Sequence, residues 1–353
     1  GPSAGKGQHV RQGPRAFRPL MRQAGDMRYV EAGGARVSVI GLGTWQFGSR
    51  EWGYGDEYAD HEARAIAERA LDLGINLIDT AEIYGFGKSE RIVGEAIRER
   101  RDEAFIATKI LPVAPLASVV EQRARGSARR LGIEQIDLYQ LHWPNPLAPI
   151  GWAMDGMRRV CDQGLVRHVG VSNYSLARWE AAERTLGRPV LSNQVQFSLV
   201  ARGPQRDLIP YAQREDRILI AYSPLAQGFL LARYDPSVPE AAASKAGGVR
   251  RANPLFTPEN LEKAVPLFAA LREVAKRHDA APAQVALAWV IRHPNVVAIP
   301  GASSVAQLER NADAANIELS DDDTGRLDEA AAAFRPKRAL ASVPNLVRGL
   351  IRR

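Results

Sequence analysis

Four side chains suited to proton transfer follow short apolar segments of the chain. They are Asp79, Tyr84, Lys109 and His142. Asp79, Lys109 and His142 each come at the end of such a segment, and Tyr84 lies in the loop after Asp79. If the segments are parallel strands and neighbours in one sheet, the four side chains meet at its carboxyl edge. An acid, a phenol, an amine and an imidazole at one place can transfer a proton to a carbonyl oxygen.

These residue types suit general acid catalysis because each changes the pKa of another. A free phenol has a pKa of about 10, too high for proton exchange near neutral pH. An ammonium beside Tyr84 lowers that pKa, a carboxylate keeps the ammonium charged, and an imidazole can orient a carbonyl or pass a proton. A general acid placed in this way contributes roughly 10²–10⁴-fold to the rate. Taken singly, the residues would be an ordinary ion pair, a packing tyrosine and a backbone-bonded histidine, and only their joint arrangement favours catalysis.

Apolar segments of strand character alternate with amphipathic helical segments along the chain. We expect strands at residues 37–41, 76–78, 104–108, 136–141, 167–171, 190–195, 218–221 and 296–299. We expect helices at residues 61–73, 88–100, 115–131, 153–163, 176–186, 205–213, 259–277, 282–292 and 305–314. Eight strand-helix units predict an α/β fold, a (β/α)8 TIM barrel with extra helices near the C-terminus. The barrel would span residues 27–334, after a basic extension, 1–26, expected to be disordered, and before a basic tail, 335–353.

A doubly wound sheet is the rival architecture, because it is built from the same units. It usually binds a dinucleotide through Gly-x-Gly-x-x-Gly after its first strand. Residues 41–46, GLGTWQ, lack the third glycine of that pattern. Residues 87–89, GKS, resemble the end of a phosphate-binding loop, but Glu82 stands where the first glycine of that loop belongs. The sequence therefore favours the barrel.

The basic charge of the chain lies at its two ends. Of the net charge of +7, residues 1–26 carry +4 and residues 335–353 carry +6, so the body between them carries −3. Nucleic-acid binding would need a basic body, so we expect no nucleic-acid partner. No segment approaches eighteen apolar residues and no apolar leader is visible, so we expect neither a membrane span nor a secretory signal. The single cysteine, Cys161, suits a reducing compartment, and we expect a cytoplasmic protein.

Eight stretches of the body, in order, resemble the aldo-keto reductase family. They are residues 41–45 (GLGTW), 79–85 (DTAEIYG), 108–109 (TK), 141–144 (LHWP), 170–174 (GVSNY), 193–198 (NQVQFS), 222–225 (YSPL) and 299–303 (IPGAS). Any one of them is weak, whereas eight in family order are specific. The resemblance covers residues from about 28 to about 330. It is closest in form to the prokaryotic members of the subset related to potassium-channel β-subunits.

The resemblance implies a TIM barrel that binds NADPH across its mouth and reduces a carbonyl substrate. Tyr84 would be the general acid, Lys109 would lower its pKa, Asp79 would pair with Lys109, and His142 would orient the substrate. The substrate would be contacted by Trp45, Tyr84, His142 and Trp143. Residues that match contacts to the nicotinamide half of the cofactor are Gly43, Thr44, Trp45, Asp79, Ser172, Asn173, Gln194 and Tyr222, the last of which could instead be a core aromatic. Residues that match the loop crossing the pyrophosphate are Ser223, Pro224, Leu225, Gln227 and Gly228.

At the adenosine end the chain departs from the commonest form of the family. Many members carry a basic residue after strand eight to hold the 2′-phosphate, and here that loop contains Gly301 and Ser303 instead. In the subset named above the basic residues follow strand seven, which makes Arg233 and Arg250 the matching candidates. An arginine suits a phosphate because its planar guanidinium donates two parallel hydrogen bonds. Residues that match contacts to adenine and phosphate are Gln307, Arg310 and Asn311, with Arg310 in place of the usual glutamate.

The leading hypothesis is an NADPH-dependent reductase of aldehydes or ketones. A binding subunit that senses NADP(H) without turnover is the alternative, but such relatives often lack the histidine that is present here as His142. A metal-dependent hydrolase has little support, because no histidine pair has metal-ligand spacing beside a strand end. Sugars, methylglyoxal-like aldehydes, quinones and natural-product ketones all stay open as substrates, and so does the oligomeric state.

Overall fold

The structure is a computed structural model that describes residues 27–48, 57–238 and 253–337. The basic extension 1–26, Arg250 and residues 338–353 of the basic tail lie outside the described residues. Within those ranges no helix has the length and apolar character needed to cross a membrane.

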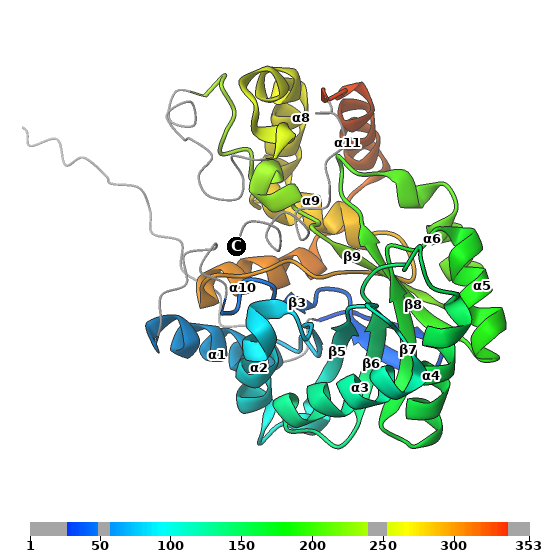
Figure 1. The fold of residues 1–353 in the computed structure, drawn as a ribbon. Helices are drawn as coiled ribbons and strands as arrows, with labels where there is room; N and C mark the ends of the chain where they lie inside the picture. The colour runs from blue at the N-terminus through cyan, green and yellow to red at the C-terminus, as the bar shows by residue number, and fades with distance from the viewer. Residues whose placement is uncertain (1–26, 49–56, 239–252, 338–353) are drawn as a thin grey trace, which may run out of the picture.

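Eight parallel strands form one sheet in chain order. They are β3 (Leu42–Gly43), β4 (Leu77–Asp79), β5 (Phe105–Ile110), β6 (Ile136–Leu141), β7 (Val166–Ser172), β8 (Val190–Gln196), β9 (Ile218–Tyr222) and β10 (Val296–Ala298). Two parallel bridges, Ile40 to Ala298 and Gly43 to Gly301, join the first strand segment to the last and close the sheet. The predicted (β/α)8 fold is confirmed (Figure 1).

Helices surround the barrel, and most of them are entered from the carboxyl end of a strand. They are α1 (Glu57–Asp72), α2 (Lys88–Ile97), α3 (Ala117–Leu131), α4 (Ile150–Asp162), α5 (Leu176–Leu186), α6 (Leu208–Arg214), α8 (Pro258–Arg277), α9 (Pro282–Ile291), α10 (Val305–Asp313) and α11 (Asp321–Ala333). Single 3₁₀ turns lie at η2 (Tyr84–Gly87), η3 (Arg101–Glu103), η4 (Gly203–Gln205), η5 (Ala226–Leu231), η7 (Pro254–Phe256) and η8 (Ala314–Asn316). Every residue of β5 and β6 is buried, because helices cover these strands outside and side chains fill the barrel inside.

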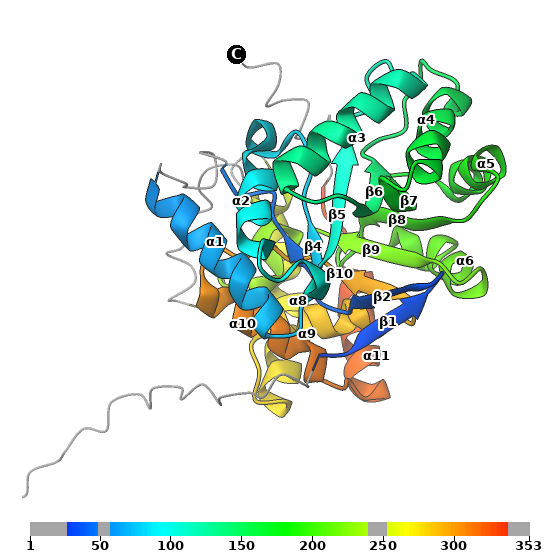
Figure 2. The same ribbon diagram turned by 90° about the horizontal axis from the view of Figure 1, so that it is seen from below.

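The prediction for the first strand, residues 37–41, is correct only in part, because Ile40 pairs with Ala298 of the barrel. Residues up to Ser38 belong instead to an antiparallel hairpin of β1 (Tyr29–Ala32) and β2 (Ala35–Ser38), and the barrel strand is β3. Gly33 and Gly34 make the two-residue turn with φ of 55° and 79°, which only glycine adopts readily at both positions. Ala32, Ala35 and Val37 pack on the side chains that fill the amino-terminal end of the barrel. The hairpin therefore closes that end (Figure 2) and leaves the carboxyl end as the mouth.

Two of the helices add a layer outside the barrel. α8 lies in the connection from β9 to α9 and packs against both α9 and α11 (Figure 1). Extra helices near the C-terminus were predicted, but α11 itself was not, because its sequence is rich in alanine and aspartate and shows only a weak apolar face. Ser320 caps α11 and three aspartates occupy its first turn, which suits the positive end of the helix dipole. The helix predicted from residue 61 begins earlier, at Glu57.

Candidate active site

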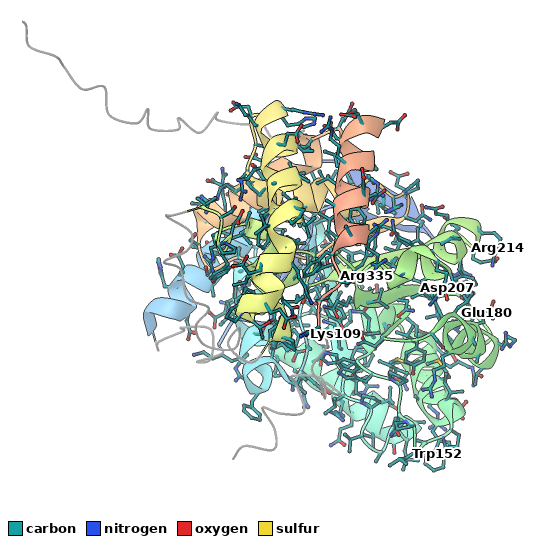
Figure 3. All side chains as sticks on the ribbon, turned by 90° about the horizontal axis from the view of Figure 1, so that it is seen from above. Lys109, Trp152, Glu180, Asp207, Arg214 and Arg335 are labelled. Atoms are coloured by element: carbon teal, nitrogen blue, oxygen red, sulfur yellow. The ribbon has the colours of Figure 1, made fainter. Side chains whose placement is uncertain are left out.

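Three neighbouring strands bring the predicted catalytic residues to the barrel mouth. Asp79 ends β4, Lys109 lies near the end of β5, and His142 follows β6 directly. Tyr84 begins the 3₁₀ turn η2 in the loop after β4. All four side chains are buried, with Tyr84 the most exposed at 8% and Lys109 fully covered. Lys109 lies deep between the surrounding elements in Figure 3, whereas Trp152, Glu180 and Arg214 lie at the edge of the molecule.

The Lys109 amine connects the other polar groups of the site. Its Nζ donates to Asp79 Oδ2 at 2.6 Å, to the Thr80 carbonyl at 2.9 Å and to the Tyr84 hydroxyl oxygen at 3.3 Å. An ammonium group has three hydrogens, so these three acceptors use all of them. The amine is thereby fixed in position with one of its hydrogens directed at the phenol.

Burial and charge act in opposite directions on these groups. Burial raises the pKa of Tyr84 above its ordinary 10, and the Lys109 charge lowers it again in part. Burial also opposes the charged amine, but Asp79 and Tyr84 outweigh it and raise the pKa of Lys109 above its ordinary value. Lys109 is therefore an ammonium and Tyr84 a neutral phenol near neutral pH. Lys109 lowers the pKa of Tyr84, as the sequence suggested, but burial raises that pKa by more.

His142 faces Tyr84 across the site as a neutral ring. Burial, followed by the Lys109 charge, holds the pKa of His142 well below 6.5. Its ring lies edge-on to the Tyr84 ring with centroids 5.8 Å apart, and it stacks on Trp143 at 6.1 Å. Within the described part of the chain its buried Nδ1 has no hydrogen-bond partner. A neutral imidazole beside a phenol can hold the oxygen of a small polar ligand.

A chain of amide and hydroxyl groups continues from the tetrad, by which we mean Asp79, Tyr84, Lys109 and His142. Gln194 Nε2 donates to Asp79 Oδ1 at 2.7 Å, and the Ser172 hydroxyl donates to the Gln194 carbonyl at 2.8 Å. Asn173 Nδ2 lies 3.0 Å from Ser172 Oγ, and its Oδ1 accepts from the Tyr222 hydroxyl at 2.9 Å. Asn173 has a φ of 63°, an uncommon conformation that asparagine tolerates better than most residues.

These groups have the chemistry to bind a neutral amide. Amide and hydroxyl side chains offer both donors and acceptors, as a carboxamide does. Tyr222 is half-buried at the end of β9, and burial raises its pKa to about 12, so its hydroxyl is a neutral donor. The structure thus brings together the predicted residues of the nicotinamide end and links them to the tetrad.

The first and last strands form a close backbone crossing beside the tetrad. Gly43 N donates to the Pro300 carbonyl at 3.1 Å, and a Cβ on Gly43 would lie 2.7 Å from the Ile299 carbonyl oxygen. A Cβ on Gly301 would lie 2.6 Å from the amide oxygen of Gln46. The Thr44 hydroxyl donates to the Asp79 carbonyl at 2.9 Å. Glycine is required at Gly43, where the neighbour is backbone, whereas Gly301 leaves room for the Gln46 side chain. The partly exposed Trp45 follows at the rim.

The loop after β9 exposes backbone in an unusual conformation. Four of its residues have positive φ values, namely Ser223 (49°), Ala226 (48°), Gln227 (58°) and Gly228 (91°). Pro224 and Leu225 between them are buried and anchor the loop. Successive residues in such conformations turn N–H groups toward one side and can make an anion-binding concavity. Ala226 and Gly228 already donate their N–H groups to the Ser223 and Leu225 carbonyls, so a phosphate at the predicted pyrophosphate loop would be bound by other N–H groups of the loop.

The predicted adenosine residues are less closely connected. Ser303 N and Oγ both donate to Gln307 Oε1 at 2.9 Å, and Asn311 Nδ2 donates to the Gly301 carbonyl at 3.2 Å. Arg310 is exposed on α10. Arg233 is exposed after η5, with a nitrogen 2.9 Å from the Tyr234 hydroxyl, and its predicted companion Arg250 is outside the described residues. Of the two arginines predicted to bind the 2′-phosphate, Arg233 is therefore the one within the described residues.

Two further polar residues of the barrel interior were missed from the sequence. Gln140 is fully buried on β6 beside Lys109, with its amide nitrogen 3.5 Å from Asp79 Oδ1. Ser192 lies 3.4 Å from the Gln140 oxygen. A Cβ on Gly170 would meet Ser192 at 2.4 Å, so that glycine provides the space. A glutamine among the large apolar residues at the carboxyl end of a predicted strand was the signal that could have revealed this position. Among the described residues no group of three or more histidine, cysteine, aspartate or glutamate side chains could hold a metal ion.

Comparisons with known proteins point to the same family as the sequence motifs. A family model described as the aldo/keto reductase family matches residues 39–332. An uncharacterized oxidoreductase of Mycobacterium bovis is 55% identical over 328 residues, 93% of this chain and 100% of that protein. The methylglyoxal reductase YeaE of Escherichia coli is 34% identical over 314 residues, 88% of this chain and 97% of that protein.

Solved structures with the same fold include two bacterial oxidoreductases. An aldo-keto reductase of Klebsiella pneumoniae in complex with NADPH aligns with a TM-score of 0.71 and 29% identity, over 89% of this chain and 98% of that one. The glycerol dehydrogenase of Gluconobacter oxydans aligns with a TM-score of 0.78 and 28% identity, over the same shares of the two chains.

Proposed function

The chain belongs to the aldo/keto reductase family and is an NADP-dependent oxidoreductase, and we propose that it reduces an aldehyde or ketone with Tyr84 as proton donor. The observation that carries this proposal is the contact between Lys109 Nζ and the Tyr84 hydroxyl at 3.3 Å, with the His142 ring edge-on to the Tyr84 ring. A neutral phenol held by an ammonium can give up its proton to a carbonyl oxygen and leave a phenolate that the ammonium stabilises.

The tetrad divides the chemical work among its members. Tyr84 donates the proton, and Lys109 stabilises the negative charge that develops on the phenol oxygen. Asp79 keeps Lys109 charged and in place through the 2.6 Å contact. His142, as a neutral ring edge-on to Tyr84, orients the substrate carbonyl toward the Tyr84 hydroxyl. This proton transfer leaves Tyr84 as a phenolate, and the cycle is complete when the alcohol has left and Tyr84 has taken up a proton again.

The residues of the mouth fit NADPH, which supplies the hydride when it is bound. Ser172, Asn173 and Gln194 would bind its carboxamide, with Tyr222 against the ring. Gly43 and Gly301 let the first and last strands approach each other closely beside the tetrad. In this arrangement the residues of the β9 loop, Ser223 to Gly228, bind the pyrophosphate.

We assign the 2′-phosphate of the cofactor to Arg233. This assignment places the chain in the form of the family that binds that phosphate after β9, as in the subset related to potassium-channel β-subunits. Arg233 is exposed and its guanidinium lies 5.0 Å from the centre of the Tyr234 ring, which holds the charged group at the surface. Preference for NADPH over NADH follows, because NADH lacks the phosphate. The single cysteine fits a cytoplasmic enzyme, which is also part of the proposal.

Small aldehydes are the first substrates to test, because a relative that is 34% identical is named a methylglyoxal reductase. The experiment measures NADPH and NADH oxidation with a panel of methylglyoxal, simple aldehydes, sugars, quinones and ketones. We expect turnover with at least one aldehyde, faster with NADPH than with NADH. Binding of NADPH without turnover across the whole panel would favour a sensing subunit instead. Equal or faster turnover with NADH would contradict the role given to Arg233.

A further inference from the structure

Two buried carboxylates flank Tyr84 along the chain and lie outside the tetrad. Glu82 precedes Tyr84 by two residues and Glu90 follows it by six. The Glu82 side chain is 9% exposed and that of Glu90 is fully buried. A buried carboxylate is unfavourable unless it is paired and hydrogen-bonded. The groups that pair with these two carboxylates therefore show what the carboxylates hold in place.

Both carboxylates are bound by arginines of the same helix, α3. Arg123 engages both oxygens of Glu82, with Nε 2.9 Å from Oε2 and Nη2 on Oε1. Arg130 Nε donates to Glu90 Oε2 at 2.6 Å. Seven residues are close to two helical turns, so both arginines project from one face of α3. This face lies toward the segment that carries Tyr84.

The same carboxylates also bind β5 on either side of Lys109. Glu82 Oε1 accepts from the Leu111 N–H at 2.7 Å, and Arg123 Nη1 donates to the Leu111 carbonyl at 2.8 Å. Glu90 Oε1 accepts from the Thr108 hydroxyl at 2.7 Å. Thr108 directly precedes Lys109 and Leu111 follows it by two residues. Each carboxylate thus joins the Tyr84 segment, β5 and α3.

The contact between Arg130 and Glu90 depends on the backbone at Gly87. This glycine has a φ of 81° and ends the turn that Tyr84 begins. A Cβ at this position would lie 2.6 Å from Arg130 Cδ and 2.8 Å from Arg130 Nε. The arginine therefore crosses directly over the glycine to reach Glu90.

We propose that Glu82–Arg123 and Glu90–Arg130 are two positioning clamps that set the distance between the Tyr84 hydroxyl and Lys109. This inference rests on the proposed function, because it gives the clamps a role in proton donation by Tyr84. Charge-assisted and bidentate contacts have narrow geometry, so they hold the Tyr84 segment against β5. The clamp residues contact neither substrate nor cofactor and act only through Tyr84 and Lys109.

Loosening a clamp has a specific electrostatic consequence. As the hydroxyl moves away from Lys109, the ammonium lowers the Tyr84 pKa less, and that pKa rises. The phenol then donates its proton less readily, and the reduction rate falls off at a higher pH than before. If the pairs only stabilised the fold, disrupting one of them would lower the melting temperature and leave the pH dependence of the rate unchanged.

The test compares three clamp variants with a control on the same helix. Arg123→Met removes the charge, Glu82→Gln keeps the shape, and Arg123→Lys keeps the charge without the bidentate geometry. Arg125→Ala is the control, because Arg125 pairs with Glu121 on the exposed side of α3. Each variant is assayed for kcat against pH with the best aldehyde of the panel, for NADPH binding by fluorescence, and for folding by circular dichroism.

We expect Arg123→Met and Glu82→Gln to lower kcat about tenfold, part of the 10²–10⁴-fold that a general acid provides. The pH at which the rate declines should rise by about half a unit or more. NADPH binding should stay within about twofold, Arg123→Lys should recover part of the rate, and Arg125→Ala should match the parent enzyme.

Folded clamp variants with the parent kcat and the parent pH profile would overturn the inference. So would variants that all fail to fold, because the pairs would then be stability elements. Tyr84→Phe in the same assays separates the two levels of the proposal. If Tyr84→Phe keeps full activity, the proposed function fails; if it is inactive while the clamp variants are normal, only the clamps fail.

Discussion

The two ends of the mouth, proposed to bind the nicotinamide and the adenosine of the cofactor, are built differently. At the nicotinamide end, Lys109, Asp79, Gln194 and Asn173 are buried or half-buried and joined by an unbroken series of hydrogen bonds. At the adenosine end, Arg233 and Arg310 are exposed, and Ser303 and Gln307 bond mainly to each other. The strands and their interior place the first set, whereas surface loops and one helix place the second.

Because of this difference, the residues for proton transfer and the residues for cofactor preference should respond differently to substitution. Groups on strand ends, fixed by bonds within the barrel, keep the geometry that proton transfer needs. Groups on exposed loops can change without disturbing that geometry, because they are joined to it by few contacts. Substitutions at the nicotinamide end should therefore affect rate and stability together, and those at the adenosine end should affect cofactor affinity alone.

The largest effect is expected from Lys109→Met. The substitution leaves the Asp79 carboxylate buried without its cation, which destabilises a fold by about 3–5 kcal/mol. It also removes the charge that stabilises the developing phenolate, so kcat should fall at least about 100-fold. Denaturant unfolding and aldehyde reduction measure the two losses. A variant as stable and as active as the parent would show that the two ends do not differ as described.

A smaller effect is expected from Arg233→Ala. Loss of the phosphate contact should raise the KM for NADPH about tenfold, or about 1.4 kcal/mol of binding free energy. The KM for NADH, kcat and the melting temperature should not change. Arg91→Ala, which removes an exposed arginine of α2, is the matched control. An equal rise in the KM for NADPH and for NADH would show that Arg233 does not bind the 2′-phosphate.

The smallest effect on kcat is expected from changing the pH between 6.5 and 9. The pKa of His142 is held well below 6.5 and that of Tyr84 is raised above 10, so neither group changes charge in this range. The reduction needs neutral Tyr84 and neutral His142, so its kcat should stay level and decline only at higher pH. Alcohol oxidation needs the phenolate and should rise with pH instead. A decline of reduction near pH 7 would contradict a neutral His142.

The sequence predicted the barrel and the meeting of the tetrad at its mouth, because both follow from local patterns, whereas the residues assigned to the nicotinamide came from the resemblance to a family. Each strand is a short apolar run, and the polar residue after it falls at the mouth by the geometry of parallel strands. Asp79, Lys109 and His142 could be placed together for this reason. The β1–β2 hairpin escaped prediction because its alternation continues almost directly into the first barrel strand, and only Gly33 and Gly34 mark the turn.

Long-range side-chain pairs could not be predicted in the same way. Nothing in the local sequence indicates that Glu82 would meet Arg123, 41 residues later, since helix packing decides that contact. Gln140 was visible as a polar residue in a predicted strand, but its proximity to Asp79 depends on the barrel interior and on the space left by Gly170. The adenosine residues were proposed by resemblance alone, and one of them, Arg250, lies outside the described residues.

Proton donation by Tyr84 is tested most directly by Tyr84→Phe, which removes one hydroxyl from the site. NADPH oxidation by an aldehyde substrate is measured together with NADPH affinity. We predict a loss of kcat of about 100-fold or more, with NADPH affinity within about twofold of the parent. Reduction at the parent rate by the folded variant would contradict the assignment of Tyr84 as the proton donor.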